Sequence, residues 1–136
     1  MSEANKAIAR RLLDEAWNQG DFRVIDEVVD NNYVNHDTQA QGTVGPSGMK
    51  NLIQTYRSAF PDLNFEVKDI LADGNKVIVR WESTGTQLGP LPQIPATGRQ
   101  VNVTGIGIMH FDQSGKVIED WANWDTIGMM QQLGVM

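Results

Sequence analysis

Two ionisable side chains, His110 and Asp125, lie near the ends of segments rich in apolar and aromatic residues. A carboxylate among tryptophans costs free energy unless it is paired or used, so Asp125 is a candidate for chemistry. Desolvation beside Trp121 would raise the pKa of this carboxyl and suit it to act as a base and then as an acid. A histidine next to it can orient the carboxylate or donate to a developing enolate oxygen. The pair therefore indicates acid–base catalysis.

Both residues also have structural alternatives. Asp125 precedes Thr126, Ile127 and Gly128, so it is equally placed to cap a following helix. His110 on its own is typical of a strand histidine that finds an ordinary hydrogen-bond partner. The two interpretations of Asp125 differ in one observable, which is whether its carboxylate points into a cavity or bonds the amides near Gly128.

The run from Val101 to Asp125 contains the elements that must position this pair. It alternates with period 2 and carries β-branched and aromatic residues, which predicts two strands. A polar turn at residues 112–115, ending in Gly115, joins the two strands as a hairpin.

The register of this hairpin decides whether His110 and Asp125 meet. A three-residue loop places His110 on the face of Asp120. A four-residue loop places it with Trp121, Asn123 and Asp125. Spacing alone leaves both registers open.

The rest of the chain predicts helices followed by an antiparallel meander. Helical periodicity marks residues 2–18, a short helix after Asp21, residues 47–60 and residues 126–133. Two further strands, 63–71 and 76–86, form a hairpin, and the Pro- and Gly-rich segment 87–99 predicts a loop that acts as a lid or rim. This order predicts the α+β class, with a curved antiparallel sheet wrapped as a cone around the N-terminal helices and an apolar pocket inside.

Composition narrows the function classes. The 136 residues predict one domain, residues 1–136, and carry a formal net charge of −6. This charge argues against nucleic acids and anionic membranes as partners, because both attract basic patches. The chain has no cysteine, and its two histidines and scattered carboxylates do not form a metal-binding motif. The first residues lack the apolar core of a signal peptide, so we expect a cytoplasmic protein.

Several aromatic residues are expected to line the pocket. Trp81 and Trp121 are predicted to face it, whereas Trp124 has the opposite parity to Trp121 and is expected to face a partner subunit. Asn123 shares the parity of Asp125, where a polar side chain needs a partner, water or ligand. Two further residues of the expected lining lie on or just after the helix at residues 47–60, namely Tyr56 and Phe60.

Short motifs along nearly the whole chain resemble the SnoaL-like polyketide cyclase (ester cyclase) family of the nuclear-transport-factor-2-like superfamily. They match in order and spacing, and they comprise Tyr33 to Asp37, Gly45 to Asp62, Leu71 to Val77, Thr84 to Thr86, Ile94 to Arg99, Asp120 to Asp125, and Gln132 to Gly134.

The resemblance implies a cone-shaped α+β barrel with a deep pocket, commonly dimeric through the outer face of its sheet. It also implies a general acid/base near the end of the last strand that removes a proton next to a carbonyl, without metal or cofactor. Asp125 is the matching position, and His110 matches a histidine of the same site. His36 is implied at the mouth or floor of the pocket, and Tyr33 of the same motif completes the expected pocket.

Three functions follow as hypotheses. The first is an enzyme that cyclises or isomerises a small apolar carbonyl compound, with Asp125 and His110 at its centre. The second is a non-catalytic ligand-binding or dimerisation module in which Asp125 is a helix cap. The third is a hydrolase like the epoxide hydrolases of the same superfold, which needs two carboxylates flanking an arginine. Arg80 with Asp120 or Asp125 could supply that arrangement, but the opposite parity of the two carboxylates counts against it.

Overall fold

The computed structural model describes residues 2–40 and 42–136. Its α-helices are α1 (Ser2–Arg11), α2 (Arg23–Val28), α3 (Gly45–Ala59) and α4 (Thr126–Leu133). Its strands are β1 (Val29–Asn35), β2 (Asn64–Asp73), β3 (Lys76–Thr86), β4 (Gln100–Phe111) and β5 (Val117–Trp124). Two short helical segments complete it, the π-helical η1 (Leu12–Asn18) and the 3₁₀-helical η2 (Thr38–Ala40).

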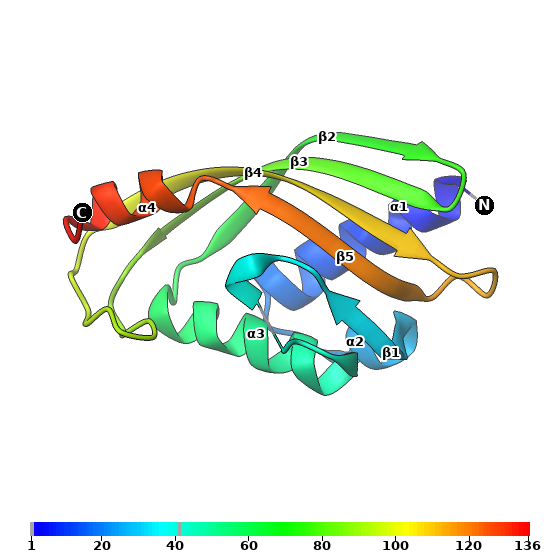
Figure 1. Ribbon diagram of the computed structural model, residues 1–136, viewed down its shortest axis with the longest axis horizontal. Helices are drawn as coiled ribbons and strands as arrows, with labels where there is room; N and C mark the ends of the chain where they lie inside the picture. Colours follow the sequence, from blue (N-terminus) through cyan, green and yellow to red (C-terminus); the bar gives the residue numbers. More distant parts are fainter. Residues whose placement is uncertain (1, 41) are drawn as a thin grey trace.

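The five strands form one curved sheet in the order β1-β5-β4-β3-β2. Helices α1, α2 and α3 lie on one side of it, and α4 closes one end of the molecule (Figure 1). This side of the sheet is called the inner face here, and the opposite side the outer face. The predicted α+β class, with a curved sheet around N-terminal helices, is confirmed.

One strand pairing departs from the prediction. Strands β2 to β5 are antiparallel neighbours, but β1 pairs with β5 in parallel, ending with Asn35 opposite Asp120. The sequence predicts only antiparallel pairing, with residues 31–37 as a short extended piece. Local alternation does not reveal this strand, because its partner lies in the other half of the chain.

The first predicted helix changes its winding near its end. The chain is α-helical to Arg11 and then π-helical over η1, before Gly20 takes a φ of 71° and stops it. A π-helical turn is wider than an α-helical one and is often found at functional sites. Leu13 and Trp17 of this segment both border the cavity described below.

The register of the β4–β5 hairpin sorts its residues between the two faces. His110 lies opposite Glu119 and Ile108 opposite Trp121, so these four share one face. Ile106 of the same set is 51% exposed, whereas Val101 and Val103 of the alternate set are buried. The set that contains His110 therefore faces outward, and the alternate set faces the helices.

Buried side chains form two clusters under the inner face. The larger joins α1, η1, α2 and α3 to the end of the sheet where β4 stops and β5 begins, around Ile25, Ile53 and Phe111. The smaller joins the end of α3 to α4 around Phe60 and Leu133. Burying one such side chain stabilises a fold by roughly 1.5–3 kcal/mol. The two clusters hold the ends of the molecule and leave a cavity between them.

No helix among residues 2–40 and 42–136 combines the length and the apolar character needed to cross a membrane. The cytoplasmic location stays a prediction.

Candidate functional site

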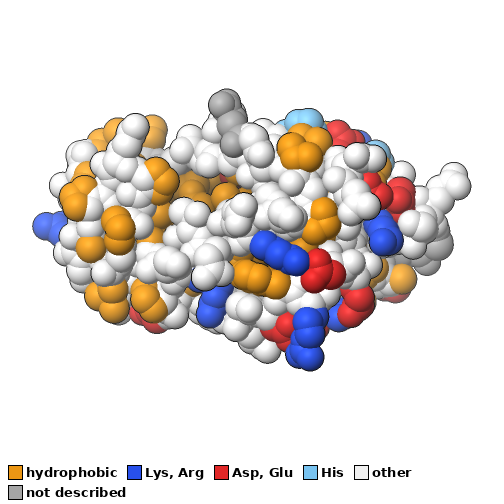
Figure 2. All heavy atoms as spheres, turned by 90° about the horizontal axis from the view of Figure 1, so that it is seen from below, with side chains coloured by type: hydrophobic (Ala, Val, Ile, Leu, Met, Phe, Trp, Pro, Cys, Tyr) orange, Lys and Arg blue, Asp and Glu red, His pale blue; other side chains and the backbone are white. Residues whose placement is uncertain are grey.

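A cavity of about 150 Å³ lies between the inner face of the sheet and the segments η1 and α3. Figure 2 shows the surface hollowed near its centre, with hydrophobic side chains inside the hollow. Most of the residues that border the cavity are apolar or aromatic, and the principal ones are Leu13, Trp17, Leu52, Tyr56, Phe60, Phe65, Val79, Trp81, Val101, Val103, Met109, Trp124 and Met129.

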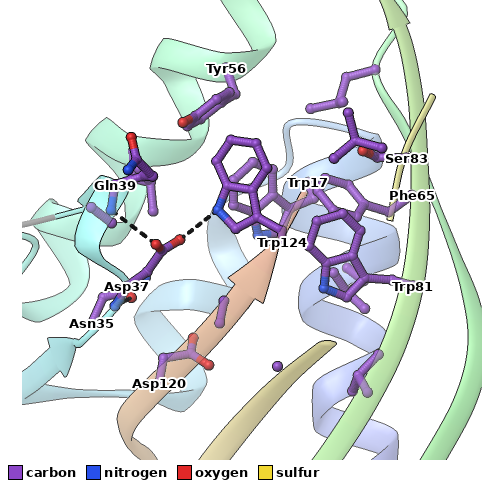
Figure 3. Close-up of a pocket in the computed structure, with 18 of the residues that line it drawn as sticks. Trp17, Asn35, Asp37, Gln39, Tyr56, Phe65, Trp81, Ser83, Asp120 and Trp124 are labelled. Carbon is purple, nitrogen blue, oxygen red and sulfur yellow. Dashed lines mark hydrogen bonds between the residues drawn. The ribbon is translucent and has the colours of Figure 1, made fainter. Parts of the chain in front are cut away.

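Aromatic rings make up two walls of this cavity (Figure 3). On one side Phe65 packs edge-on against both Trp17 and Trp81, with ring centres 5.0 and 4.9 Å apart. On the other, Tyr56 and Trp124 meet nearly at right angles at 6.4 Å. The Trp81 ring has room because Gly105 lies opposite it, and any Cβ at that position would overlap the indole. An apolar molecule is therefore the ligand type that these walls favour.

Asp120 is the carboxyl group of the inner face of β5 that borders this cavity. Its Oδ2 accepts a hydrogen bond of 2.9 Å from the hydroxyl of Tyr33 on the neighbouring strand β1. The pKa of Asp120 is raised to about 7, chiefly by burial; the Tyr33 hydrogen bond acts to lower it and the charge of nearby Asp37 acts to raise it. An acid with such a pKa can both accept and return a proton near neutral pH.

Asp37 is the second carboxyl group at the cavity, and it follows β1 directly. Its Oδ2 accepts a 2.9 Å hydrogen bond from the indole N–H of Trp124, and its Oδ1 accepts one from the backbone N–H of Gln39. The side chain of Asn35 in turn accepts from the backbone N–H of Asp37, which fixes the turn after the strand. Asp37 is therefore held in place by neutral donors (Figure 3).

Sequence reasoning did not select Asp37, and it named Asp120 only in the hydrolase alternative. The available signal was the period-2 pattern of Tyr33, Asn35 and Asp37, which puts polar groups on the same side as a buried aromatic residue. Tyr33 itself does not border the cavity. It is fully buried in the core and reaches the site only through its hydroxyl.

The predicted pocket location of Asp125 is wrong. This residue is exposed, and its Oδ1 accepts a 2.8 Å hydrogen bond from the backbone N–H of Gly128 at the start of α4. Its side chain is thereby used as the N-cap of that helix, which is the structural alternative given for it above. The cavity-facing carboxyl on β5 is Asp120, five residues earlier.

The contact between His110 and Asp125, which the spacing left open, does not form, although His110 does share a face with Trp121 and Asn123. That face is the outer one. Nδ1 of His110 lies 3.0 Å from Glu119 Oε1, and Nε2 of His36 lies 2.9 Å from the other oxygen of the same carboxylate. Neither histidine borders the cavity.

The remaining expected residues divide between the two faces. Trp81, Tyr56 and Phe60 border the cavity. Trp121 borders it too, but its indole stacks on His36 at 5.1 Å. Asn123 is exposed opposite Ile106 on the outer face.

Two further predictions are wrong. Trp124, expected to face a partner, is an inner-face residue bonded to Asp37. The arrangement of an epoxide hydrolase does not form, because Arg80 pairs at 2.6 Å with the exposed Asp69.

The model of the SnoaL-like polyketide cyclase family matches residues 7–133. TsrD from Streptomyces laurentii has a similar structure with a TM-score of 0.88 at 28% identity, covering 98% of this chain and 97% of that one. AclR from Streptomyces galilaeus, a proposed hydroxylase, gives a TM-score of 0.84 at 27% identity, covering 100% and 99%. A proposed SnoaL-like polyketide cyclase from Jannaschia sp. CCS1 gives 0.90 at 24% identity, covering 99% and 94%, and so shows the common fold.

No curated protein matches the chain at a significant level. The family model spans all but the two ends of the sequence, and the solved structures reproduce the same sheet and helices. The chain belongs to the SnoaL-like polyketide cyclase family.

Proposed function

We propose that the protein is a cofactor-independent enzyme that transfers a proton at a carbon next to a carbonyl group, and so cyclises or isomerises a small apolar substrate. The observation that carries this proposal is the position of Asp120, a carboxyl with a pKa of about 7 at the base of an aromatic cavity. Membership of a cyclase family supports the same general type of reaction.

Asp120 has one oxygen in use and one available. Tyr33 donates to Oδ2, while Oδ1 accepts no hydrogen bond from the residues that the structure describes. In the proposed reaction Oδ1 removes the proton, electron density moves to the carbonyl oxygen, and the protonated Asp120 later returns the proton to the product. The burial of Asp120 strengthens each of these interactions, because they act in a medium of low polarity.

The developing enolate needs a hydrogen-bond donor in the cavity. His110, expected in this role, lies on the outer face. The indole N–H of Trp81 borders the cavity and makes no hydrogen bond to the described part of the chain, so it is the donor that we assign.

Exchange of carbon-bound protons for deuterium tests this proposal without a known substrate. Purified protein in D₂O is incubated with a series of small aryl ketones, and loss of the proton signal next to the carbonyl is followed by NMR. We expect Asp120→Asn to reduce the rate by roughly 100-fold or more, because a positioned general base contributes that much.

Asp125→Asn is the matched control, because it makes the same substitution five residues away and outside the cavity. It is expected to keep the wild-type rate. Equal rates in wild type and Asp120→Asn would contradict the role of Asp120. Binding of the ketones without any exchange would instead support the non-catalytic binding module, the candidate that the helix-capping role of Asp125 favours.

We further propose that two copies associate through the outer face of the sheet. An apolar row crosses four strands there, from Leu71 through Ile78 and Ile108 to Trp121, and Leu71 is 63% exposed. Exposed apolar patches of this kind mark interaction sites. Light scattering after size exclusion should give the mass of a dimer, and Ile108→Asp should give that of a monomer. A wild-type protein that elutes as a monomer would contradict the proposal.

A further inference from the structure

The volume of the cavity limits the size of the ligand that it can enclose. An apolar cavity of about 150 Å³ in a protein core holds a molecule of the size of benzene. Pockets that enclose drug-sized ligands measure roughly 300–1,000 Å³. The cavity here, at about 150 Å³, therefore has room for one six-membered ring with a small substituent.

Trp124 is the side chain that limits this room. It stands on the inner face at the end of β5 and, with Tyr56, forms one aromatic wall of the cavity (Figure 3). Its indole N–H is bonded to Asp37, and its ring packs edge-to-face against Tyr56. These two anchors come from separate elements, the turn after β1 and helix α3, so the indole cannot turn aside without losing both.

Beyond Tyr56 the character of the surface changes. A second, more open hollow shares Gln39, Leu52 and Tyr56 with the cavity, and its lining mixes apolar side chains such as Pro92 with the polar side chains of Asn51 and Thr55. A second fused apolar ring that extended past Tyr56 would leave the aromatic rings and lie partly against polar side chains, whose hydrogen bonds to water it would displace without replacing them.

From these contacts we infer that the ligand of the cavity is a single-ring carbonyl compound, and that Trp124, fixed by Asp37 and Tyr56, excludes larger ring systems. The inference that the ligand carries a carbonyl group rests on the proposed function, since the carbonyl is the group next to which Asp120 would remove a proton. The limit of one ring rests only on the dimensions of the cavity and the anchoring of Trp124. The two parts can therefore fail separately.

Three methyl ketones that differ only in ring number test the limit, namely acetophenone, 2-acetylnaphthalene and 2-acetylanthracene. Their dissociation constants are measured by isothermal titration calorimetry with the wild type and with Trp124→Ala. The wild type is expected to bind acetophenone roughly tenfold or more tightly than the three-ring ketone, since an apolar pocket discriminates at least this much per poorly fitting group. Trp124→Ala is expected to reverse the order.

Trp124→Phe keeps an aromatic ring but loses the indole N–H that donates a hydrogen bond to Asp37. It therefore separates the effect of the volume of the side chain from the effect of its hydrogen bond to Asp37. It should fold even where Trp124→Ala does not, and it is expected to bind 2-acetylnaphthalene more tightly than the wild type does. Circular dichroism and thermal melting check that each variant is folded.

A wild type that binds the three-ring ketone as tightly as acetophenone would overturn the size limit. So would an unchanged order of affinities in both Trp124 variants. Acetophenone that binds without Asp120-dependent proton exchange would leave the size limit standing and overturn the proposed reaction. Asp120-dependent proton exchange on the three-ring ketone in the wild type would support the proposed reaction and overturn the size limit.

Discussion

Glu119 and Asp120 are neighbours on β5, yet their carboxyl groups lie in opposite environments. Glu119 faces outward between His110 and His36, and hydrogen bonds from both histidines hold its pKa below the usual range. Asp120 faces inward among aromatic rings, and burial raises its pKa to about 7. One step along the strand thus changes an ordinary surface carboxylate into a candidate acid–base group.

The groups of residues around Glu119 and around Asp120 also show that residue types alone are a poor guide to the position of the site. Both histidines of the chain and a carboxylate meet on the outer face, a set that looks catalytic in the sequence. The cavity under the inner face is bordered by the carboxyl groups of Asp37 and Asp120 and by mostly apolar walls. The apolar walls cause the pKa shift on which the chemistry depends, because they disfavour the charged form.

The largest expected effect is a contrast in pH-dependent stability. Asp120 binds its proton more tightly in the folded state than in the unfolded chain, so its ionisation costs stability as the pH rises from about 4 to above 7. The side chain of Asp120→Asn stays neutral at every pH and avoids this loss. Between pH 4 and pH 8 we therefore expect the free energy of unfolding of the wild type to fall by about 2–4 kcal/mol more than that of the variant. Urea denaturation at the two pH values measures this.

Glu119→Gln is the matched variant with the opposite sign. The lowered pKa of Glu119 means that its charge stabilises the fold above its ordinary pKa, and that this contribution is lost as the pH falls through the folded value. The variant should therefore be slightly less stable than the wild type at pH 7 and equal to it at the lowest pH. A shift of stability in the same direction by both variants at neutral pH would contradict the claim that the two carboxyl groups lie in opposite electrostatic environments.

A smaller effect is expected when the Tyr33 hydroxyl is removed. Its hydrogen bond lowers the pKa of Asp120, so Tyr33→Phe should raise that pKa above its present value. The loss of a hydrogen bond to a carboxyl in this buried position should also cost about 1.5 kcal/mol of stability. Carbon-13 NMR of the labelled carboxyl groups follows the titration.

Tyr56→Phe is the control for Tyr33→Phe, since the Tyr56 hydroxyl lies at the same cavity without a bond to Asp120. It should leave the pKa of Asp120 where it is. Equal shifts from the two variants would assign the effect to the cavity in general instead of to the Tyr33 hydrogen bond.

The smallest effect is expected at Asp125. Asp125→Ala removes the cap of α4 and should cost about 1 kcal/mol, while Asp125→Asn should cost little because asparagine also caps helices. Neither substitution should move the pKa of Asp120. A shift of that pKa in either variant would mean that the cap and the cavity are coupled.

Sequence patterns were sufficient to predict the family, the α+β class and the order of the main strands and helices. They were also sufficient for cavity residues whose hydrophobicity is unambiguous, such as Trp81, Tyr56 and Phe60. Alternation shows which residues share a face, but it does not show which face is turned toward the helices.

The β4–β5 hairpin shows why the choice of face failed. Its outer face carries Ile106, Ile108 and Trp121, which look like core residues, whereas its inner face includes Gly105 and Gly107. Gly105 hides the signal because its missing side chain makes room for the ring of Trp81. The assignment of Trp124 to a partner was therefore wrong, whereas Trp121 stands on the outer face and still borders the cavity.

The parallel pairing of β1 with β5 has a consequence for how the molecule is assembled in time. Strands β2 to β5 are joined by hairpins and connections between neighbours, so each can pair as soon as it exists. β1 precedes β2, β3 and β4 in the chain, whereas its partner β5 follows them. Contacts between distant parts of a chain form slowly because a long loop must close first. We expect Asp37 and Asp120 to come together in one of the last steps of folding, so that the cavity is completed only after the frame around it is built.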